Sequence, residues 1–242
     1  MENHFSQKRY VSSSIVDMNG NFRFDGVLGV FQDTATAHSA QMGVDHDRLV
    51  VSSNAFWVLS KVKFRIDGVF KTDDEIVADT WPLKPSAYRF IREHKITKDG
   101  GTVDGRSEWC VLDCEKLTVR KSSSIDYPHD MDCLEERASV SDFLRLNVAE
   151  EDCNYCYDYT TRLTDVDCNG HVNNLAYARM ALNVFSPEEY PVYGFNAFEI
   201  HFVSQTYHGD TVKVYVKKDV DTVYVEGRMD DKTVFKALFY KE

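Results

Sequence analysis

The chain has 242 residues, of which 43% are hydrophobic and 13% aromatic, and its formal net charge at pH 7 is −11. This composition supports a packed core and excludes a disordered chain. The acidic excess argues against general binding of nucleic acid or of an anionic membrane surface. No apolar run approaches the roughly 20 residues of a membrane-spanning helix. The first residues lack the basic and apolar character of a signal or transit peptide, so we expect a cytoplasmic protein.

The first half of the chain predicts a strand, a long helix and a run of antiparallel strands. A strand is predicted over residues 8–17, followed by the turn-forming pair Asn19-Gly20. Apolar residues from Phe24 to Met42 recur at spacings of three and four, which predicts a helix that Gly43 stops. From Ala55 the period changes to two, and one predicted face carries Val58, Val62, Phe64 and Ile66. Three more strands are predicted at 74–81, 88–98 and 102–112, with a hairpin turn at Asp99-Gly100-Gly101.

The second half repeats this order after a charged, serine-rich segment. Residues 122–153 are interpreted as a linker, with a short helix predicted around 140–146. A strand at 155–163 follows, and then a helix whose apolar stripe consists of Leu175, Ala178, Leu182 and Phe185. The remaining strands are predicted at 197–203, 211–217, 222–228 and 233–240. We therefore expect two domains, 1–121 and 154–242, joined by residues 122–153.

Two short motifs occur once in each half, in the same order. Val16-Asp17-Met18-Asn19-Gly20-Asn21 resembles Val166-Asp167-Cys168-Asn169-Gly170-His171, and Asn54-Ala55-Phe56 is repeated as Asn196-Ala197-Phe198. A repeat of this length indicates tandem domains rather than a solenoid. A strand, a long helix and a wrapping antiparallel sheet form the hotdog fold. We predict an α+β tandem (double) hotdog, each a long helix wrapped by an antiparallel sheet, in which the two hotdogs pair as a pseudo-dimer.

Only the second copy of the loop carries a histidine, which makes it the candidate site. The Asp167 carboxylate can act as a base or as a nucleophile, and the Asn169 amide can donate a hydrogen bond or hold a water. His171 can orient the carboxylate or protonate a leaving group. Asn173 or Asn174 is the expected N-cap of a helix whose first N–H groups suit an oxyanion. The alternative is structural, because Asn-Gly turns commonly place an Asp hydrogen bond on nearby backbone.

Six cysteines are scattered through the chain, and we expect reduced thiols. Cys153-x-x-Cys156 has the spacing of half a zinc site, but the sequence contains no second pair to complete it. The spacing is therefore interpreted as chance, and no metal is expected.

The loop and three further segments resemble a known family. Residues 167–177 look like the D-x-N-x-H-V-N-N-x-x-Y motif of hotdog thioesterases. Residues 54–61, 74–81 and 105–112 resemble strand motifs of the plant and bacterial acyl-[acyl-carrier-protein] thioesterases, in the family's order. The resemblance implies hydrolysis of fatty acyl thioesters on acyl-carrier protein (ACP), which releases free fatty acid and ends chain elongation. Without a transit peptide, it suggests a bacterial form.

The same resemblance implies roles for four residues. The family's acting Asp, Asn and His correspond to Asp167, Asn169 and His171. A fourth position, usually Glu, falls near Gln205, which cannot act as an acid or base but can hold a water or the Asn169 amide. Plant members carry a Cys where this chain has Thr206, so a thiol nucleophile is not implied.

The resemblance also implies a partner and a place for the acyl chain. The expected partner is ACP with a phosphopantetheine-linked fatty acyl chain; no cofactor is required, and a homodimer is one possible assembly. The acyl pocket is expected in the first half, where Phe31, Trp57 and Leu59 are candidate lining residues that core packing explains equally well. Docking of acidic ACP would need a basic surface. Two basic stretches are candidates, although solvated faces are the simpler interpretation: Lys61, Lys63 and Arg65, and Lys84, Arg89, Arg92 and Lys95.

Three other functions stay open at this point. The chain could hydrolyse acyl-coenzyme A instead of acyl-ACP. It could be a hotdog dehydratase or hydratase, although that class does not need Asp167 together with Asn169. It could also bind acyl thioesters without cleaving them, as a non-catalytic module.

Overall fold

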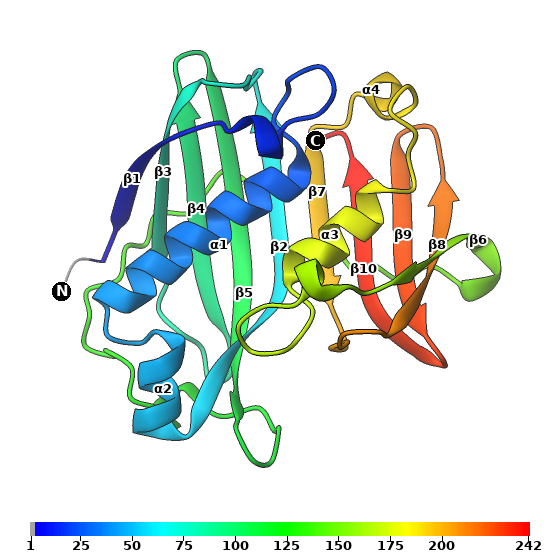
Figure 1. Ribbon diagram of the computed structural model, residues 1–242. Helices are drawn as coiled ribbons and strands as arrows, with labels where there is room; N and C mark the ends of the chain where they lie inside the picture. The colour runs from blue at the N-terminus through cyan, green and yellow to red at the C-terminus, as the bar shows by residue number, and fades with distance from the viewer. Residues whose placement is uncertain (1–2) are drawn as a thin grey trace. The chain divides into compact units, whose positions relative to one another are not determined.

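The computed structural model describes residues 3–242 and divides into two compact units, Met1–Val140 and Ser141–Glu242. The division falls inside the segment 122–153 that the sequence marks as a linker. Each unit contains its own antiparallel sheet and its own long helix (Figure 1).

The first unit wraps a five-stranded sheet around one long helix. Its strands run in the order β1-β3-β4-β5-β2, and α1 lies diagonally across them (Figure 1). The elements are β1 (Phe5–Tyr10), the 3-10 helix η1 (Ser13–Ile15), α1 (Phe24–Gln41), α2 (His46–Ser53), β2 (Ala55–Asp67), β3 (Glu75–Pro82), β4 (Phe90–Lys98), β5 (Gly101–Asp113) and η2 (Ser122–Ser124).

The second unit repeats this topology with a shorter helix. Its strand order is β7-β10-β9-β8-β6, so each strand has the same neighbours as its counterpart in the first unit. The elements are η3 (Glu150–Asp152), β6 (Asn154–Thr160), η4 (Leu163–Asp165), α3 (Asn174–Leu182), α4 (Tyr190–Tyr193), β7 (Ala197–Phe202), β8 (Thr211–Lys218), β9 (Thr222–Met229) and β10 (Lys232–Tyr240). The predicted tandem hotdog is therefore confirmed.

The apolar stripe of α1 forms the core of the first unit as the sequence predicts. Val27, Leu28 and Phe31 are at most 2% exposed, and the Phe31 ring packs edge-on against Phe64 of β2, with centroids 5.8 Å apart. The predicted stop at Gly43 is also confirmed, because this residue adopts a left-handed φ of 74° that glycine tolerates.

A β-bulge changes which residues of β2 face the core. The register with β5 shifts between Leu59 and Lys61. The extra residue reverses the alternation, so Leu59 before the bulge and Val62 after it are both buried, whereas Val58 is only half-buried. The prediction that Val58 and Val62 share one face is therefore wrong.

Both predicted first strands extend too far. β1 ends at Tyr10, and the Ser12 hydroxyl then caps the 3-10 helix η1 by accepting from the Ser14 N–H. β6 likewise ends at Thr160, before the 3-10 helix η4. Serine and aspartate side chains compete for backbone hydrogen bonds and so end strands that apolar patterning alone would continue.

The predicted helices in the second half of the chain also differ from the structure. Residues 141–149 form no helix, and the Leu144 N–H donates to the Glu199 carboxylate (2.9 Å) instead of to a helical carbonyl. The helix α3 ends at Leu182, so Phe185 is not part of its stripe. Pro187 follows closely, and the residue before a proline disfavours helical backbone.

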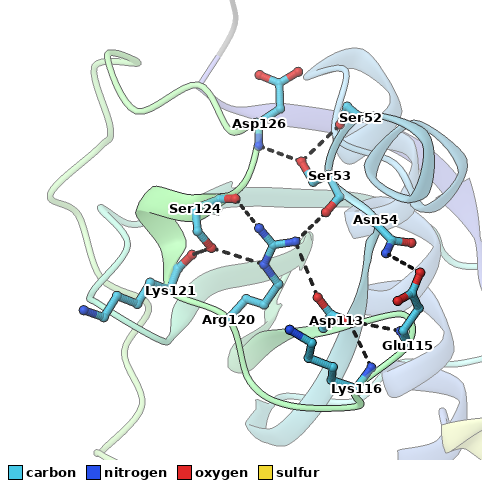
Figure 2. A network of polar contacts seen from close by, with 10 residues as sticks. All are labelled: Ser52, Ser53, Asn54, Asp113, Glu115, Lys116, Arg120, Lys121, Ser124 and Asp126. Carbon is cyan, nitrogen blue, oxygen red and sulfur yellow. Dashed lines mark hydrogen bonds and ion pairs between the residues drawn. The ribbon is translucent and has the colours of Figure 1, made fainter.

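The short helix α2 was not predicted, and a polar network holds its end (Figure 2). Asp45 caps its start by accepting from the Arg48 N–H (3.1 Å). At its other end, the Arg120 guanidinium donates to the backbone carbonyls of Ser53 and Ser124. This network ties the chain that follows β5 to the end of α2.

We predict that Gly105→Ala destabilises the first unit. A Cβ at Gly105 would overlap the Phe31 ring, so the ring or the strand must move. Overpacking of this kind lowers the free energy of unfolding by about 1–3 kcal/mol. Denaturant unfolding measures it. The same change in a Phe31→Leu background should cost less, and an equal cost in both backgrounds would contradict the steric explanation.

Candidate active site in the Asp167 loop

The loop that precedes α3 is a tight turn closed by backbone hydrogen bonds. Val166 and Val172 form a β-bridge, and the Asp167 N–H donates to the His171 carbonyl (2.9 Å). The Gly170 N–H donates to the Asp167 carbonyl (3.1 Å), and Gly170 has a left-handed φ of 77°. The turn therefore places Asp167, Asn169 and His171 together at the start of the helix.

The helix start follows the prediction. Asn173 is the N-cap of α3, and its side chain accepts from the Leu175 N–H (2.9 Å). The positive end of the α3 dipole therefore lies directly after His171, which favours negative charge there.

The predicted site residues differ in exposure and in their contacts. Asp167 and His171 are half-buried, whereas Asn169 and Gln205 are exposed. The His171 ring packs edge-on against Tyr207, with centroids 5.3 Å apart. In residues 3–242, no hydrogen bond joins the side chains of Asp167, Asn169, His171 and Gln205 to one another.

Backbone contacts nevertheless bring the segment that carries Gln205 to the loop. The Val172 N–H donates to the Thr206 carbonyl (3.0 Å), so the residue after Gln205 is bonded to the residue after His171. Thr206 is fully buried, and its N–H donates to the Tyr177 hydroxyl (3.1 Å). The two hydroxyl groups of Tyr177 and Thr206 share a second hydrogen bond (2.9 Å).

Tyr177, the last residue of the 167–177 motif, is a positioning residue whose role the sequence did not indicate. Its burial raises its pKa, so the hydroxyl stays protonated at neutral pH. The corresponding positions in the first unit are the apolar residues Val27 and Phe70, where the Phe22 N–H donates to the Phe70 carbonyl (3.0 Å). An alignment of the two copies would have revealed this polar pair.

The equivalent loop in the first unit has the same backbone. The Asp17 N–H donates to the Asn21 carbonyl (2.7 Å), the Gly20 N–H donates to the Asp17 carbonyl (3.0 Å), and Gly20 has a φ of 73°. The two loops therefore differ in their side chains rather than in their path.

The two aspartate carboxylates make different numbers of hydrogen bonds. Asp17 accepts from the N–H groups of Asn19 and Asn21 (both 2.8 Å) and from the Asn21 amide (3.2 Å). Across the described part of the chain, Asp167 accepts a single hydrogen bond, from the Asn169 N–H (2.8 Å). Asp167 therefore lacks two bonds that Asp17 has, one from the backbone N–H and one from the side-chain amide of Asn21, and most of its acceptor capacity is available to a substrate or water.

The first loop is also covered, whereas the second is open. The Thr72 N–H donates to the Gly20 carbonyl (3.1 Å), and the Lys71 ammonium donates to the Asn19 carbonyl (2.9 Å). Around Gly170, by contrast, no described atom outside the adjacent residues Asn169 and His171 lies within 4 Å of where a Cβ would be. Only the second loop presents its turn to an incoming molecule.

Two family models match most of the chain. The acyl-ACP thioesterase N-terminal domain matches residues 2–126, and the acyl-ACP thioesterase C-terminal domain matches residues 149–234. The chain belongs to the acyl-ACP thioesterase family. It is a thioester hydrolase, and the family's reaction is cleavage of the thioester of acyl-ACP.

Solved structures share the fold of this thioesterase along nearly its whole length. An acyl-ACP thioesterase from Bacteroides thetaiotaomicron has a TM-score of 0.88 at 21% identity, covering 99% of this chain and 98% of that one. A 12:0-ACP thioesterase from Umbellularia californica has a TM-score of 0.82 at 13% identity, covering 98% and 93%. No curated protein matches the chain. At these identities the likeness shows the double hotdog fold.

The two basic stretches do not form continuous basic surfaces on which acidic ACP could dock. Lys63 and Arg92 are buried, at 0% and 8% exposure. Lys61 and Arg89 both approach the carboxylate of Glu108, at 3.5 Å. The interpretation as solvated basic faces is therefore wrong for Lys63 and Arg92. The charges of Lys61 and Arg89 are partly balanced by Glu108.

The described chain contains neither a metal cluster nor a membrane helix. Within residues 3–242, no group of three or more His, Cys, Asp or Glu side chains is placed to hold a metal ion. Cys153 and Cys156 are free thiols. None of the helices in that range is long and apolar enough to span a bilayer.

We predict that Tyr177→Phe loosens the segment that carries Gln205. The change leaves the buried Thr206 N–H without its acceptor, which costs about 1–3 kcal/mol of unfolding free energy. Denaturant unfolding and amide hydrogen exchange at Thr206 measure the effect. Tyr88→Phe, at an exposed tyrosine, is the matched control, and equal effects of the two changes would rule out the positioning role.

Proposed function

We propose that this thioesterase cleaves fatty acyl-ACP at the Asp167 loop, releasing free fatty acid and ending chain elongation in fatty acid biosynthesis. The observation that carries the proposal is the unsaturated carboxylate of Asp167, which accepts one hydrogen bond where Asp17 accepts three. Since the two turns share one backbone, this difference supports a chemical role in the second unit alone.

The proposed reaction uses the turn and the helix start together. The acyl carbonyl would bind at the start of α3, where the positive end of the helix dipole stabilises the developing oxyanion. In one route, Asp167 takes a proton from water, the water oxygen bonds to the carbonyl carbon, and the C–S bond breaks as the thiolate is protonated. In the other, the Asp167 carboxylate bonds to the carbonyl carbon and expels the thiol, and water then hydrolyses the resulting anhydride.

The other three residues would orient the reacting groups. His171, held edge-on by Tyr207, is placed to orient Asp167 or to protonate the leaving thiol. Asn169 and Gln205 are exposed amides that can hold a water or the carbonyl. Gln205 cannot exchange protons, so proton transfer is assigned to Asp167 and His171. Thioester resonance is weak, so the mechanism requires no metal or organic cofactor.

The acyl chain itself is proposed to bind in the first unit. Phe31 is packed between Phe64 and His94 and is a core residue. Trp57 is half-buried beside an aromatic group that includes Phe90, with ring centroids 4.8 Å apart. Leu59 is buried in the core, at 3% exposure, so Trp57 is the best placed of the three candidate lining residues to meet a chain.

We predict that Asp167→Asn removes most turnover and leaves the fold intact. The change keeps the shape and the hydrogen bond from the Asn169 N–H but removes the negative charge, so kcat for thiol release should fall by about 100-fold or more. Release of the ACP thiol from dodecanoyl-ACP measures the rate.

The first unit supplies the matched control. Asp17→Asn makes the same change in the same turn, and we expect it to lower stability while leaving kcat within about twofold. Near wild-type turnover by Asp167→Asn, or equal losses in both variants, would refute the assignment.

We predict that ACP thioesters are better substrates than coenzyme A thioesters. The family membership supports the ACP form, whereas the net charge of −11 opposes docking of an acidic protein. A comparison of kcat/KM for dodecanoyl-ACP and dodecanoyl-coenzyme A decides, and we expect at least about a tenfold preference, equivalent to roughly 1.4 kcal/mol. A preference for coenzyme A would favour the acyl-coenzyme A thioesterase, and binding without release of thiol would favour the non-catalytic module.

A further inference from the structure

The face of the first unit's sheet that packs against α1 contains four buried polar residues. Each is at most 8% exposed: Thr80 on β3, Arg92 and His94 on β4, and Ser107 on β5. Their contacts place them on the inner face. The Arg92 guanidinium lies 2.9 Å from His38 Nδ1 of α1, and the His94 ring stacks on Phe31 of α1, with centroids 4.3 Å apart.

The same positions in the second unit are apolar. Equivalent turns precede β3 and β8, where the Val11 N–H donates to Asp74 and the Thr161 N–H donates to Asp210. From these turns the register gives the correspondence. In the first unit, Thr80 pairs with His94, and Arg92 pairs with Ser107. In the second unit, the equivalent pairs are Val216 with Val225 and Val223 with Phe239. A hotdog core is thus complete with Val216, Val223, Val225 and Phe239, and packing does not explain the polar set.

Arg92 is a buried cation with neutral partners. Its guanidinium contacts His38, the Thr80 hydroxyl (3.4 Å) and the Met42 sulfur (3.8 Å). Within residues 3–242, no carboxylate forms an ion pair with it. Burial lowers the pKa of Arg92 to about 10, so the group is still charged at neutral pH. An unpaired buried charge is strongly unfavourable unless a ligand supplies the counter-charge.

His94 presents an unused donor beside this charge. Its Nε2 lies 2.8 Å from the Ser107 hydroxyl, which already accepts from the Trp109 indole N–H (2.8 Å). Ser107 can therefore donate its proton to Nε2, which places the His94 proton on Nδ1. Burial and the Arg92 charge lower the pKa of His94 well below its ordinary value, so the ring is neutral. Nδ1 is buried and has no hydrogen-bond partner.

The longer helix of the first unit encloses this group. α1 has 18 residues, whereas α3 has nine. The C-terminal half of α1, which α3 lacks, contains His38 and ends at the C-cap Met42. Beyond Met42 lies an aromatic cluster that includes Phe90 and Tyr127, with ring centroids 5.1 Å apart. The longer helix and the polar group therefore occur together, in the unit that is proposed to hold the acyl chain.

We propose that Arg92 and His94 bind a carboxylate at the far end of the acyl chain, so that the thioesterase accepts ω-carboxyacyl groups on ACP. The inference rests on the proposed function and deepens it by naming the substrate class. A carboxylate supplies the negative charge that Arg92 lacks and the acceptor oxygen that His94 Nδ1 lacks. The contact of Arg92 with the flexible Met42 thioether is its weakest and is the one an anion would replace.

The test separates binding from turnover. Wild-type protein is titrated calorimetrically with two pantetheine thioethers that cannot be hydrolysed, one ending in a methyl group and one in a carboxylate, and with free dodecanoate. Hydrolysis of dodecanoyl-ACP and of the ω-carboxy acyl-ACP of equal length is measured in parallel. Arg92→Met removes the charge at similar volume, Arg92→Lys keeps it, and Arg89→Met is the control at an exposed arginine near the start of the same strand.

We expect the wild type to prefer the ω-carboxy compounds by about 10- to 100-fold in both Kd and kcat/KM, the range of a charge-assisted hydrogen bond. Arg92→Met should abolish the preference, Arg92→Lys should keep part of it, and Arg89→Met should keep all of it. Equal binding of the two thioethers, or an unchanged preference in Arg92→Met, overturns the proposal. A third result also overturns it: free dodecanoate binds in a way that needs Arg92, but the two thioethers bind equally. Arg92 would then hold the carboxylate of the released product and not one at the far end of the acyl chain. Preferential binding without hydrolysis would overturn the proposed function alone.

Discussion

The number of hydrogen bonds that one aspartate carboxylate accepts distinguishes the two halves of this thioesterase. Both units build the same turn before their long helix, with the same backbone bonds and the same left-handed glycine. In the first unit, Asn21 donates two hydrogen bonds to the carboxylate of Asp17, from its backbone N–H and from its side-chain amide, and the turn is a structural element. In the second, Asp167 accepts one hydrogen bond and lies before the N-terminus of α3, where we propose that the oxyanion is stabilised. On this proposal, function is added to a turn that the fold requires anyway.

The first unit differs from the second in its interior as well as in its turn. Its turn is covered by Lys71 and Thr72, and its interior contains a longer helix and the polar residues Arg92 and His94. These changes weaken an ordinary core, since buried polar groups without partners are unfavourable. The second unit therefore combines an apolar interior with a turn whose carboxylate is available, whereas the first combines a hydrogen-bonded turn with an interior that contains Arg92 and His94.

The sequence predicts the fold well where side-chain periodicity is regular. Most strands, the helix α1 and the repeat are readable because apolar spacing and turn residues agree. The bulge at Leu59 and Lys61 is not readable, since one extra residue inverts the alternation without leaving a signal in composition. The burial of Lys63 and Arg92 is hidden for the same reason, because charged residues that alternate along a strand normally face solvent. The site loop was recognised from its histidine, but the role of Asn21 as a hydrogen-bond donor to Asp17 required coordinates.

The claim that only the second turn receives the acyl carbonyl can be tested without catalysis. Backbone amide chemical shifts would be followed while the protein is titrated with an acyl-pantetheine ketone, in which a methylene replaces the sulfur. We expect shifts in the amides of Asn169 to Leu175, at the turn and the first turn of α3, and none in the amides of Asn19 to Phe22. Shifts at the first turn, or equal shifts at both, would contradict the account.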